Sequence, residues 1–394
     1  MRAPAATAPD VVYEWLDRQE QVDAIESEWR AVEARVTDRM VFGSWDHLAP
    51  WYRHHGPVHG MPLVGVARRA GEVVGIAPLA IRKATLGRVP VRRVESAGHD
   101  ADAGELLFPA EEPRLLEGLF HSLLDRGGFD VMVLVGLAPG SWRHEALRRV
   151  VAARRLRARE TPYRYATVDL SQGYDAYHDG LSAKLRGNIR RRLKRAESLG
   201  GVSIDRLREP TDEATLRSYV DRMFGIYERS WKADRREPLQ NYHRRFYREV
   251  TERFNRRGLL DLSILKVGGR DAAFILGYRE GAAYYDGTIS YDEEFAGVSP
   301  GTLLIQDVAR LVAGEGVTLL VSHGDREYKK FWVSRWVEQL RVLVFAPGPR
   351  AALAEFARFE FPKLVARVRG GSGGKAAKRA ETGTAASGEE GSEA

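Results

Sequence analysis

The sequence has no cysteine among its 394 residues. This absence excludes disulfide bonds, thiolate metal sites and a cysteine nucleophile. Long apolar runs are also missing, because no stretch approaches the ~18 consecutive apolar residues that a membrane-spanning helix needs. The opening residues, MRAPAATAPDVVYEW, lack the continuous apolar segment of a signal peptide. The default expectation is a cytoplasmic protein with no integral membrane span.

The composition indicates a folded, basic protein. Hydrophobic residues make up 44% of the chain, which is enough for one large core or, more in keeping with the length, two domains. The formal net charge of +7 favours anionic partners such as CoA phosphates, a lipid pyrophosphate, RNA or a membrane surface. Residues 1–10 and 370–394 are small and polar, so we expect both ends to be disordered.

Two glycine-turn hairpins suggest an internal repeat. Residues 63–79 read as two strands around Ala70-Gly71, and residues 262–278 read the same way around Gly268-Gly269. Helical sequence precedes each hairpin, and a strand, a helix and a further strand follow it. This order predicts two copies of one α/β unit, although glycine-turn hairpins are common in unrelated proteins. We place the first unit at 11–160, the second at 161–350 and a C-terminal helix at 351–369.

Residues 282–332 carry the most informative pattern. An apolar strand, 282–289, leads into a turn-rich loop, and a helix opens at Ser299-Pro300-Gly301-Thr302. Serine suits the N-cap and proline the first helical position. A short β-branched strand, 317–322, follows this helix and precedes a second helical start at Tyr328. A helix whose free amides face a crevice between two strands is a ready anion site.

This pattern, together with other segments, carries a family resemblance. The chain resembles the CelD-type acetyltransferases of cellulose and polysaccharide biosynthesis, a tandem-GNAT group related to the Fem aminoacyltransferases. The likeness runs from Tyr13 to about Pro347. The segments that carry it are Phe42 to Trp45, Val74 to Leu79, Leu181 to Arg192, Trp231, Ser299 to Leu304 and Gly324 to Lys329.

The resemblance implies an α/β (α+β) fold of two tandem GNAT-like domains, each a mixed, mostly antiparallel sheet flanked by helices. It also implies acyl transfer from acetyl-CoA or another acyl-CoA, without a metal, to an amine or hydroxyl. Ser299, Gly301 and Thr302 would hold the pyrophosphate. The GNAT loop pattern is Arg/Gln-x-x-Gly-x-Gly/Ala, and this chain has Ala296 at the basic position and Ser299 at the first glycine. The alternative for Ser-Pro-Gly is a helix cap alone.

The resemblance also supplies catalytic candidates. Tyr328 is expected to protonate the leaving thiolate, and Lys329 to stabilise charge in the transition state. Asp286 and His323 are the candidates for the general base. The structural alternatives are a packed tyrosine, a solvated lysine, a turn aspartate and a core histidine.

The basic run of 184–195 is the strongest concentration of charge. Leu185, Ile189 and Leu193 form an apolar stripe at helical spacing, and basic residues fill the other positions. This run is either a solvated helix face or a binding surface for an anionic acceptor. In the second case the acceptor would contact Lys184, Arg186, Arg190 and Trp231. No aromatic-interleaved RNA-binding pattern accompanies the run.

Three functions remain open at this point. The first is acyl transfer from acyl-CoA to a small-molecule, glycan or lipid-linked acceptor, such as a cell-envelope precursor. The second is Fem-like aminoacyl transfer from tRNA. The third is a non-catalytic accessory role in polysaccharide biosynthesis. The sequence names neither the acceptor nor the oligomeric state.

Overall fold

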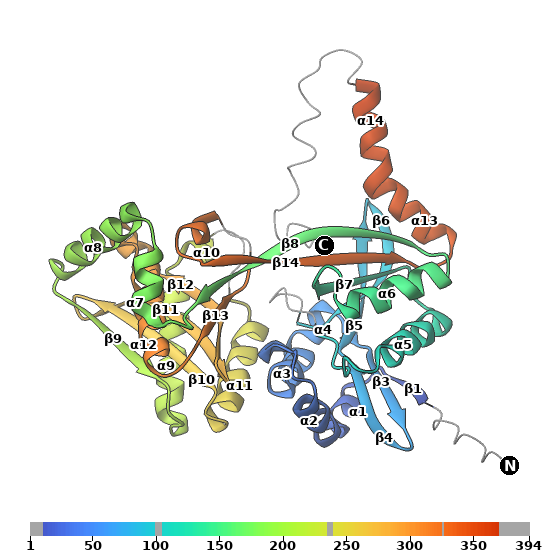
Figure 1. The fold of residues 1–394 in the computed structure, drawn as a ribbon, viewed down its shortest axis with the longest axis horizontal. Helices are drawn as coiled ribbons and strands as arrows, with labels where there is room; N and C mark the ends of the chain where they lie inside the picture. Colours follow the sequence, from blue (N-terminus) through green and yellow to red (C-terminus); the bar gives the residue numbers. More distant parts are fainter. Residues whose placement is uncertain (1–10, 99–104, 235–238, 325–326, 370–394) are drawn as a thin grey trace.

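Two long antiparallel strands, β8 (Arg157–Asp169) and β14 (Arg335–Phe345), join the two halves of the chain (Figure 1). The computed structural model describes residues 11–98, 105–234, 239–324 and 327–369. β14 pairs with β8 on one side and with β7 (Val131–Leu137) on the other, and the end of β8 pairs with β13 (Leu319–Ser322). One sheet of eleven strands therefore crosses both halves, in the order β2-β5-β6-β7-β14-β8-β13-β12-β11-β10-β9.

The first half builds one end of this sheet and a separate small sheet, β1-β3-β4. Helix α5 crosses over to make β6 and β7 parallel neighbours. The other elements of this half are β1 (Val11–Leu16), α1 (Gln19–Ala24), α2 (Glu26–Arg35), η1 (Val41–Gly43), α3 (Trp45–His54), α4 (Gly56–His59), β2 (Met61–Pro62), β3 (Val64–Arg69), β4 (Glu72–Ala77), β5 (Leu79–Leu86), β6 (Val89–Ser96), α5 (Pro113–Arg126) and α6 (Trp142–Ala153).

The second half repeats this plan. Helix α12 makes β12 and β13 parallel neighbours, and β9 to β12 are antiparallel. Its elements are α7 (Gly173–Gly180), α8 (Ala183–Glu197), β9 (Val202–Leu207), α9 (Glu213–Glu228), α10 (Trp231–Asp234), α11 (Asn241–Arg256), β10 (Leu260–Val267), β11 (Arg270–Glu280), β12 (Ala283–Tyr291), η3 (Glu293–Val298), α12 (Pro300–Gly314) and η4 (Glu327–Phe331). The predicted mixed α/β class, with helices flanking the sheets, is confirmed, but the two repeated units share one sheet through β8 and β14 and do not each have a sheet of their own.

The two predicted hairpins form as expected. Ala70 and Gly71 have φ of 51° and 87°, and Gly268 and Gly269 have φ of 57° and 76°. Two-residue turns of this kind need positive φ at both central positions, which glycine adopts easily. Gly71, Gly268 and Gly269 therefore favour these turns, and the turns set the register of each hairpin. The first hairpin, however, lies in the small sheet, whereas the second lies in the large one.

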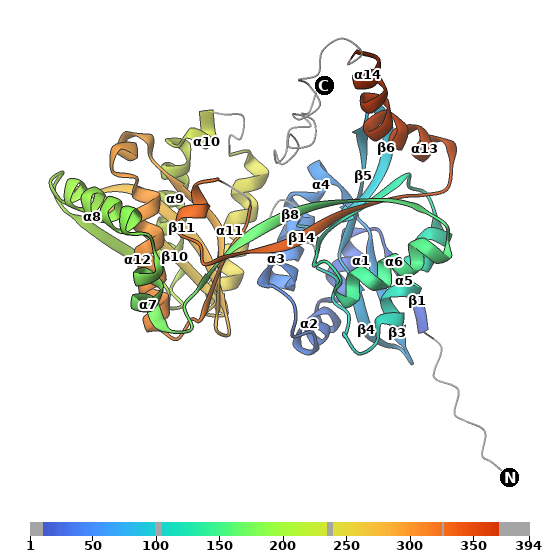
Figure 2. The ribbon, with the colours of Figure 1, turned by 45° about the horizontal axis from the view of Figure 1, so that its top comes forward.

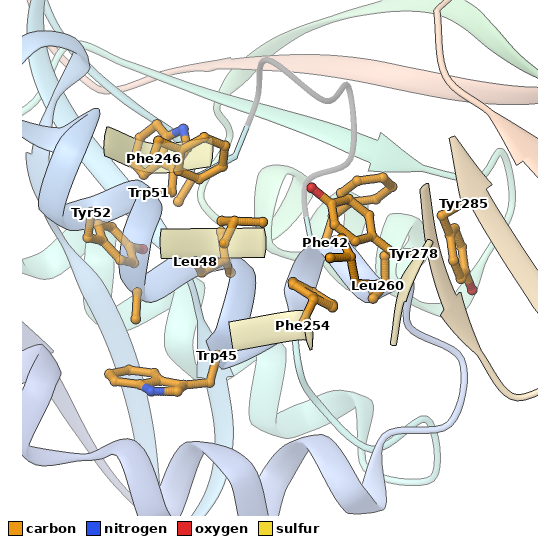
Figure 3. Close-up of a cluster of buried hydrophobic side chains, with 14 of the residues drawn as sticks. Phe42, Trp45, Leu48, Trp51, Tyr52, Phe246, Phe254, Leu260, Tyr278 and Tyr285 are labelled. Carbon is orange, nitrogen blue, oxygen red and sulfur yellow. The ribbon is translucent and has the colours of Figure 1, made fainter. Parts of the chain in front are cut away.

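The largest core cluster belongs to both halves at once (Figure 3). Aromatic side chains of η1 and α3 in the first half meet α11 and the strands of the second half. Phe42 lies 6.1 Å from Tyr278 and 5.9 Å from Tyr285 between ring centroids. Because this contact is buried and apolar, it holds the halves in one arrangement.

Buried ion pairs supplement that contact. Asp46 of α3 accepts two hydrogen bonds from Arg30 and one, at 2.7 Å, from Arg257 of α11. Arg39 donates twice to Glu280, at 2.7 and 3.1 Å. Burial alone would raise the pKa of Asp46, but the hydrogen bonds from Arg30 and Arg257 lower it below its usual value. The Asp46 and Glu280 pairs each link the first half to the second.

The chain after β14 forms a helical arm of α13 (Pro349–Glu355), a π-helical turn η5 (Phe356–Glu360) and α14 (Phe361–Arg369). Within the described residues, no helix has the length and hydropathy to cross a membrane. The boundary expected at 160/161 falls inside β8. The predicted terminal segments 1–10 and 370–394 lie outside the described residues.

Candidate active site

The site begins where two parallel strands stop pairing. β12 and β13 pair from Ala283↔Leu319 to Asp286↔Ser322, and β13 ends there while β12 continues to Tyr291. A register shift opposite Gly277 leaves Gly287 as a bulge residue directly after Asp286. A Cβ on Gly287 would lie 2.6 Å from the ring of Tyr278, so this position needs glycine. The bulge and the strand end together place Asp286 at an interruption of the sheet.

A buried chain of polar groups closes this strand end. The Ser322 hydroxyl donates to Asp286 Oδ2 at 2.7 Å, and Lys329 Nζ donates to the Ser322 Oγ at 2.8 Å. Lys329 also donates to the carbonyl oxygen of His323. The residues are 6%, 0% and 3% exposed in the order Asp286, Ser322 and Lys329. A carboxylate and an ammonium thus share one hydroxyl inside the protein, which places a fixed dipole at the end of β13.

His323 follows Ser322 and faces the first half. Its ring lies 4.8 Å from Phe42 and 5.5 Å from Tyr165 between centroids. Burial lowers the pKa of His323 to about 3, and the charges of Lys329 and His47 act in the same direction. The imidazole is therefore neutral at pH 7, where it is a weak proton acceptor but retains one N–H to donate. Within the described residues, neither ring nitrogen has a hydrogen-bond partner.

The first half contributes a carboxyl group that the sequence did not reveal. A Cβ on Gly43 would lie 2.7 Å from both Cβ and Cγ of Glu105, so this glycine lets η1 pack on the glutamate. Glu105 accepts the Met40 amide at 3.1 Å. Burial raises the pKa of Glu105 to about 7, although the charges of Arg143 and Arg39 oppose the shift. A carboxyl group with this pKa changes protonation near neutral pH, which is the property of a general base.

Two tyrosines lie within the electrostatic reach of Glu105. Burial raises the pKa of Tyr285 to about 12, and the charges of Glu280 and Glu105 add to the shift. Burial also raises the pKa of Tyr165, again with a contribution from Glu105. Both phenols therefore keep their protons and can donate hydrogen bonds. The site unites Glu105 and Phe42 from the first half with Asp286, Ser322 and Lys329 from the second.

The N-terminus of α12 has a geometry different from the one expected. Ser299 occupies the N-cap position, but its side chain makes no capping hydrogen bond, and its backbone is left-handed with φ of 49°. The amides of Thr302 and Leu303 both donate to the Ser299 carbonyl. A Cβ on Gly301 would only touch Tyr291 and Ile289, at 3.6 and 3.8 Å. The helix thus begins beside the part of β12 that extends past the end of β13. The Ser299 hydroxyl makes no capping hydrogen bond there.

Lys329 lies in a short 3-10 helix, η4, at the position of the expected second helical start. η4 is tied to the preceding helices because Tyr177 donates to the carbonyl of Trp332 at 2.6 Å and accepts from Gln306 at 3.0 Å. These buried bonds fix the position of η4 relative to α12. Tyr328 lies in η4, but its side chain is outside the described part of the chain.

The basic helix α8 packs beside the start of α12. The Arg195 guanidinium lies 3.3 Å from where a Cβ on Gly297 of η3 would be. Within the described residues, six basic side chains of α8 have no carboxylate partner: Lys184, Arg190, Arg191, Arg192, Lys194 and Arg195. Arg186 instead donates to the carbonyls of Asp179 and Leu181, which satisfies the end of α7. α8 therefore presents positive charge next to the predicted phosphate loop.

Helix α10 reaches the same strand edge. Lys232 Nζ donates to the carbonyl of Ile289, on the part of β12 that continues past Asp286, at 2.9 Å. Trp231 precedes it and is half-buried. Two surface depressions elsewhere, one along α9 and one beside His144 of α6, contain none of the site residues.

Comparisons with known proteins agree with this geometry. Residues 183–330 match the family described as "Acetyltransferase (GNAT) domain". This segment carries a GNAT domain. It contains the four predicted catalytic positions and all of α12, and it begins at α8. No curated protein matches the chain.

Solved structures resemble the whole chain. FemX is 11% identical, with a TM-score of 0.55 over 84% of this chain and 98% of its own. A conserved protein of unknown function from Bacteroides thetaiotaomicron is 12% identical, with a TM-score of 0.52 over 85% and 100%. L-PGS from Bacillus licheniformis is 13% identical, with a TM-score of 0.50 over 87% and 96%. At these identities the likeness concerns the fold.

The structure brings together only some of the predicted residues. Asp286, His323 and Lys329 meet at one strand end. Ser322 and Glu105 were missed, because no specific local sequence pattern indicates either. A serine that ends a β-branched strand, next to a histidine, was the available signal for Ser322.

Proposed function

We propose that this protein transfers an acyl group, with acetyl as the expected one, from acyl-CoA to an amine or hydroxyl. The observation that carries this proposal is the end of β13, where Asp286, Ser322 and Lys329 form a buried polar chain beside the interrupted edge of β12. The α12 amides and the unpaired charges of α8 supply complementary charge for the phosphates of the donor. The acyl-CoA supplies the activated carbonyl.

The acid-base roles follow from the charges of the site. Glu105, with a pKa of about 7, takes the proton of the attacking amine or hydroxyl. Lys329 and the N–H of neutral His323 stabilise the negative charge that develops on the carbonyl oxygen. As the C–S bond breaks, the leaving thiolate receives a proton, and the resemblance assigns this step to Tyr328. Asp286 holds Lys329 in position through Ser322.

The acceptor is proposed from the resemblance alone. A CelD-type assignment points to a sugar or a cell-envelope polysaccharide precursor. In this proposal the acceptor approaches from the side of Glu105 and Phe42, where the two halves meet, and the donor lies on the side of α12. The acceptor contacts predicted at Lys184, Arg186, Arg190 and Trp231 stay predictions. In this proposal α8 serves the donor instead, because it packs beside η3 and the start of α12.

A second candidate is aminoacyl transfer from tRNA. The unpaired basic side chains of α8 favour it, because a run of this kind suits a phosphate backbone. FemX and L-PGS, at 11% and 13% identity, are among the proteins of similar fold. A non-catalytic accessory role is the third alternative.

The test is calorimetric titration of the purified protein with acetyl-CoA, longer acyl-CoAs and charged tRNA, at low and physiological salt. Micromolar acyl-CoA binding that is lost in Gly301→Leu is the expected result, because the added side chain projects toward Tyr291 and Ile289 at the start of α12. Gly314→Leu, at the other end of α12 where a Cβ meets nothing, is the matched control. Binding of charged tRNA without any CoA species would overturn the donor assignment.

A further inference from the structure

The helical arm after β14 has an apolar stripe that faces away from the protein. Leu353, Phe356, Phe361 and Leu364 are 55%, 47%, 52% and 50% exposed. Only five other large hydrophobic side chains in the described residues are this exposed, and they are scattered over 12–331. Four such side chains within 353–364 therefore form a concentrated patch.

A π-helical turn aligns the two parts of this stripe. The Phe361 amide donates to the Phe356 carbonyl, five residues back, instead of four as in an α-helix. In an uninterrupted α-helix, residues five apart point about 140° from each other. Here the rings of Phe356 and Phe361 lie 6.4 Å apart between centroids, so they share one face. The turn extends the stripe from α13 onto α14.

The opposite face of the arm is the one that packs on the protein. Ala351 and Ala354 belong to a buried cluster with Val91 of β6 and Phe345 of β14. The backbone of Arg358 lies 2.5 Å from where a Cβ on Gly87 would be, so the β5–β6 turn packs against η5. In both views α14 extends away from the body of the protein (Figure 1, Figure 2). The stripe is thus left outside the core by the fold itself.

The charges of the arm identify the kind of surface that would cover the stripe. The segment 349–369 has five basic residues, Arg350, Arg358, Lys363, Arg367 and Arg369, and two acidic residues, Glu355 and Glu360. Both carboxylates are paired with Arg159 of β8, at 3.0 and 2.8 Å. Lys363 is 62% exposed beside Phe361 and Leu364. Lys363 also pairs with Glu360 at 3.4 Å and Arg350 with Asp130 at 3.7 Å, but basic residues still outnumber acidic ones in this segment. A projecting helix with an apolar stripe and an excess of basic residues fits an anionic bilayer interface.

We propose that α13–α14 is a docking element that inserts its apolar stripe into the interface of a membrane containing anionic phospholipid. The arm lies on the first half, away from the Asp286–Lys329 site, so docking leaves that site unaltered. Reversible binding to the membrane surface would hold the protein next to lipid-linked or membrane-bound molecules without a spanning helix.

The experiment is flotation of the full chain with vesicles of 30% phosphatidylglycerol in phosphatidylcholine and with vesicles of phosphatidylcholine alone. We expect binding to the anionic vesicles only, weakened at least tenfold by Phe361→Ser/Leu364→Ser and by Arg358→Glu/Lys363→Glu. Val58→Ser/Met61→Ser is the matched control, because these side chains are equally exposed, at 57% and 55%, but lie elsewhere. It should bind like the wild type. The variants change exposed positions except for Arg358, which is half-buried, and an unchanged melting temperature verifies that each is folded.

Two results would overturn the proposal. One is the absence of binding to anionic vesicles, or binding that the Phe361→Ser/Leu364→Ser variant retains in full. The other is a wild-type protein that does not bind vesicles but forms a concentration-dependent dimer, measured by light scattering, which the Phe361→Ser/Leu364→Ser variant does not form. That outcome would assign the stripe to a second copy of this chain.

Discussion

Each half of the protein contains a pair of parallel strands connected by a helix, but the polar side chains at the ends of the two pairs differ. In the first half, β6 and β7 pair across α5, and two polar side chains at the described strand end accept backbone amides. Ser96 accepts the amide of Val135, and Tyr163 accepts the amide of Gly136. In the second half, the corresponding end carries Asp286, Ser322 and Lys329, together with His323, whose two ring nitrogens have no hydrogen-bond partner among the described residues.

The crossover helices differ in the same sense. Neither helix has an acidic residue in its first turn, but the residues at their N-cap positions differ. Helix α5 begins after Glu112, a carboxylate that is paired with Arg69, whereas α12 begins after the uncharged Ser299. Anions favour a helix N-terminus without nearby carboxylates. The comparison suggests that one repeat kept a ligand site while the other became a structural support that also supplies Glu105.

Lys329→Met should have the largest effect. Methionine keeps most of the volume but removes the ammonium, which leaves Asp286 buried without its cation. Lys329 reaches Asp286 through the Ser322 hydroxyl, and leaving a buried polar group without its donor typically costs about 1–3 kcal/mol. We expect a loss of that order in the free energy of unfolding and at least a hundredfold loss of acyl transfer. Denaturant unfolding and thiol release from acyl-CoA measure the two effects.

The double variant Asp286→Asn/Lys329→Met separates the two roles of this lysine. Because both charges are gone, we expect stability to recover in part while activity stays low. If the double variant also regains activity, Lys329 acts only in folding. The polar groups at the end of β13 would then have no role in catalysis.

Glu105→Gln should have the next largest effect. With a pKa of about 7, Glu105 is protonated below and anionic above neutral pH, so kcat/KM should rise with pH through this value. In the glutamine variant, kcat/KM should no longer rise with pH through this range, and kcat should fall at least tenfold. The raised folded-state pKa also means that Glu105 favours folding below its ordinary pKa of 4.5 and loses this contribution as pH rises toward 7. If kcat/KM of the variant still rises with pH as in the wild type, another residue is the general base.

Gly43→Val should have a moderate effect on stability and a selective effect on the site. The new side chain meets Cβ and Cγ of Glu105 at 2.7 Å, so one of the two must shift. Overpacking of this kind costs about 1–3 kcal/mol. Acyl-CoA affinity, measured by calorimetry, should stay within twofold while kcat falls. Equal losses in both quantities would contradict the placement of donor and base on opposite halves.

Ser96→Ala should have the smallest effect. It removes the acceptor of the Val135 amide and costs about 1 kcal/mol. Acyl-CoA binding and kcat should be unchanged, since the first-half strand end has no ligand in this account. Thermal melting and calorimetry test both statements, and a drop in affinity would show that the first half also binds the donor.

The sequence predicted what depends on local chemistry. Glycines at 71, 268 and 269 determine the hairpins, and proline and glycine determine the start of α12. Asp286, His323 and Lys329 were found through the family resemblance. The roles assigned to them individually, and the contacts of Trp231 and Tyr328, stay predictions.

The remainder depends on contacts between distant residues. The Asp286–Ser322 hydrogen bond needs the parallel register of two strands 36 positions apart, which no local pattern specifies. The pKa of Glu105 arises from burial beneath η1, which becomes visible only when Gly43 is placed. The continuous sheet depends on β14 returning to β7 of the first half. Sequence periodicity identifies a strand but not its partner.

The most direct test of the central claim is a hydrogen–deuterium exchange footprint of acetyl-CoA on the wild-type protein. The account predicts slower exchange in 286–303 and 319–324, around the ends of β12 and β13 and the start of α12. It predicts no change in 93–97 and 131–137, at the matching strand end of the first half. Protection of the first-half segments, without protection of the second, would contradict it.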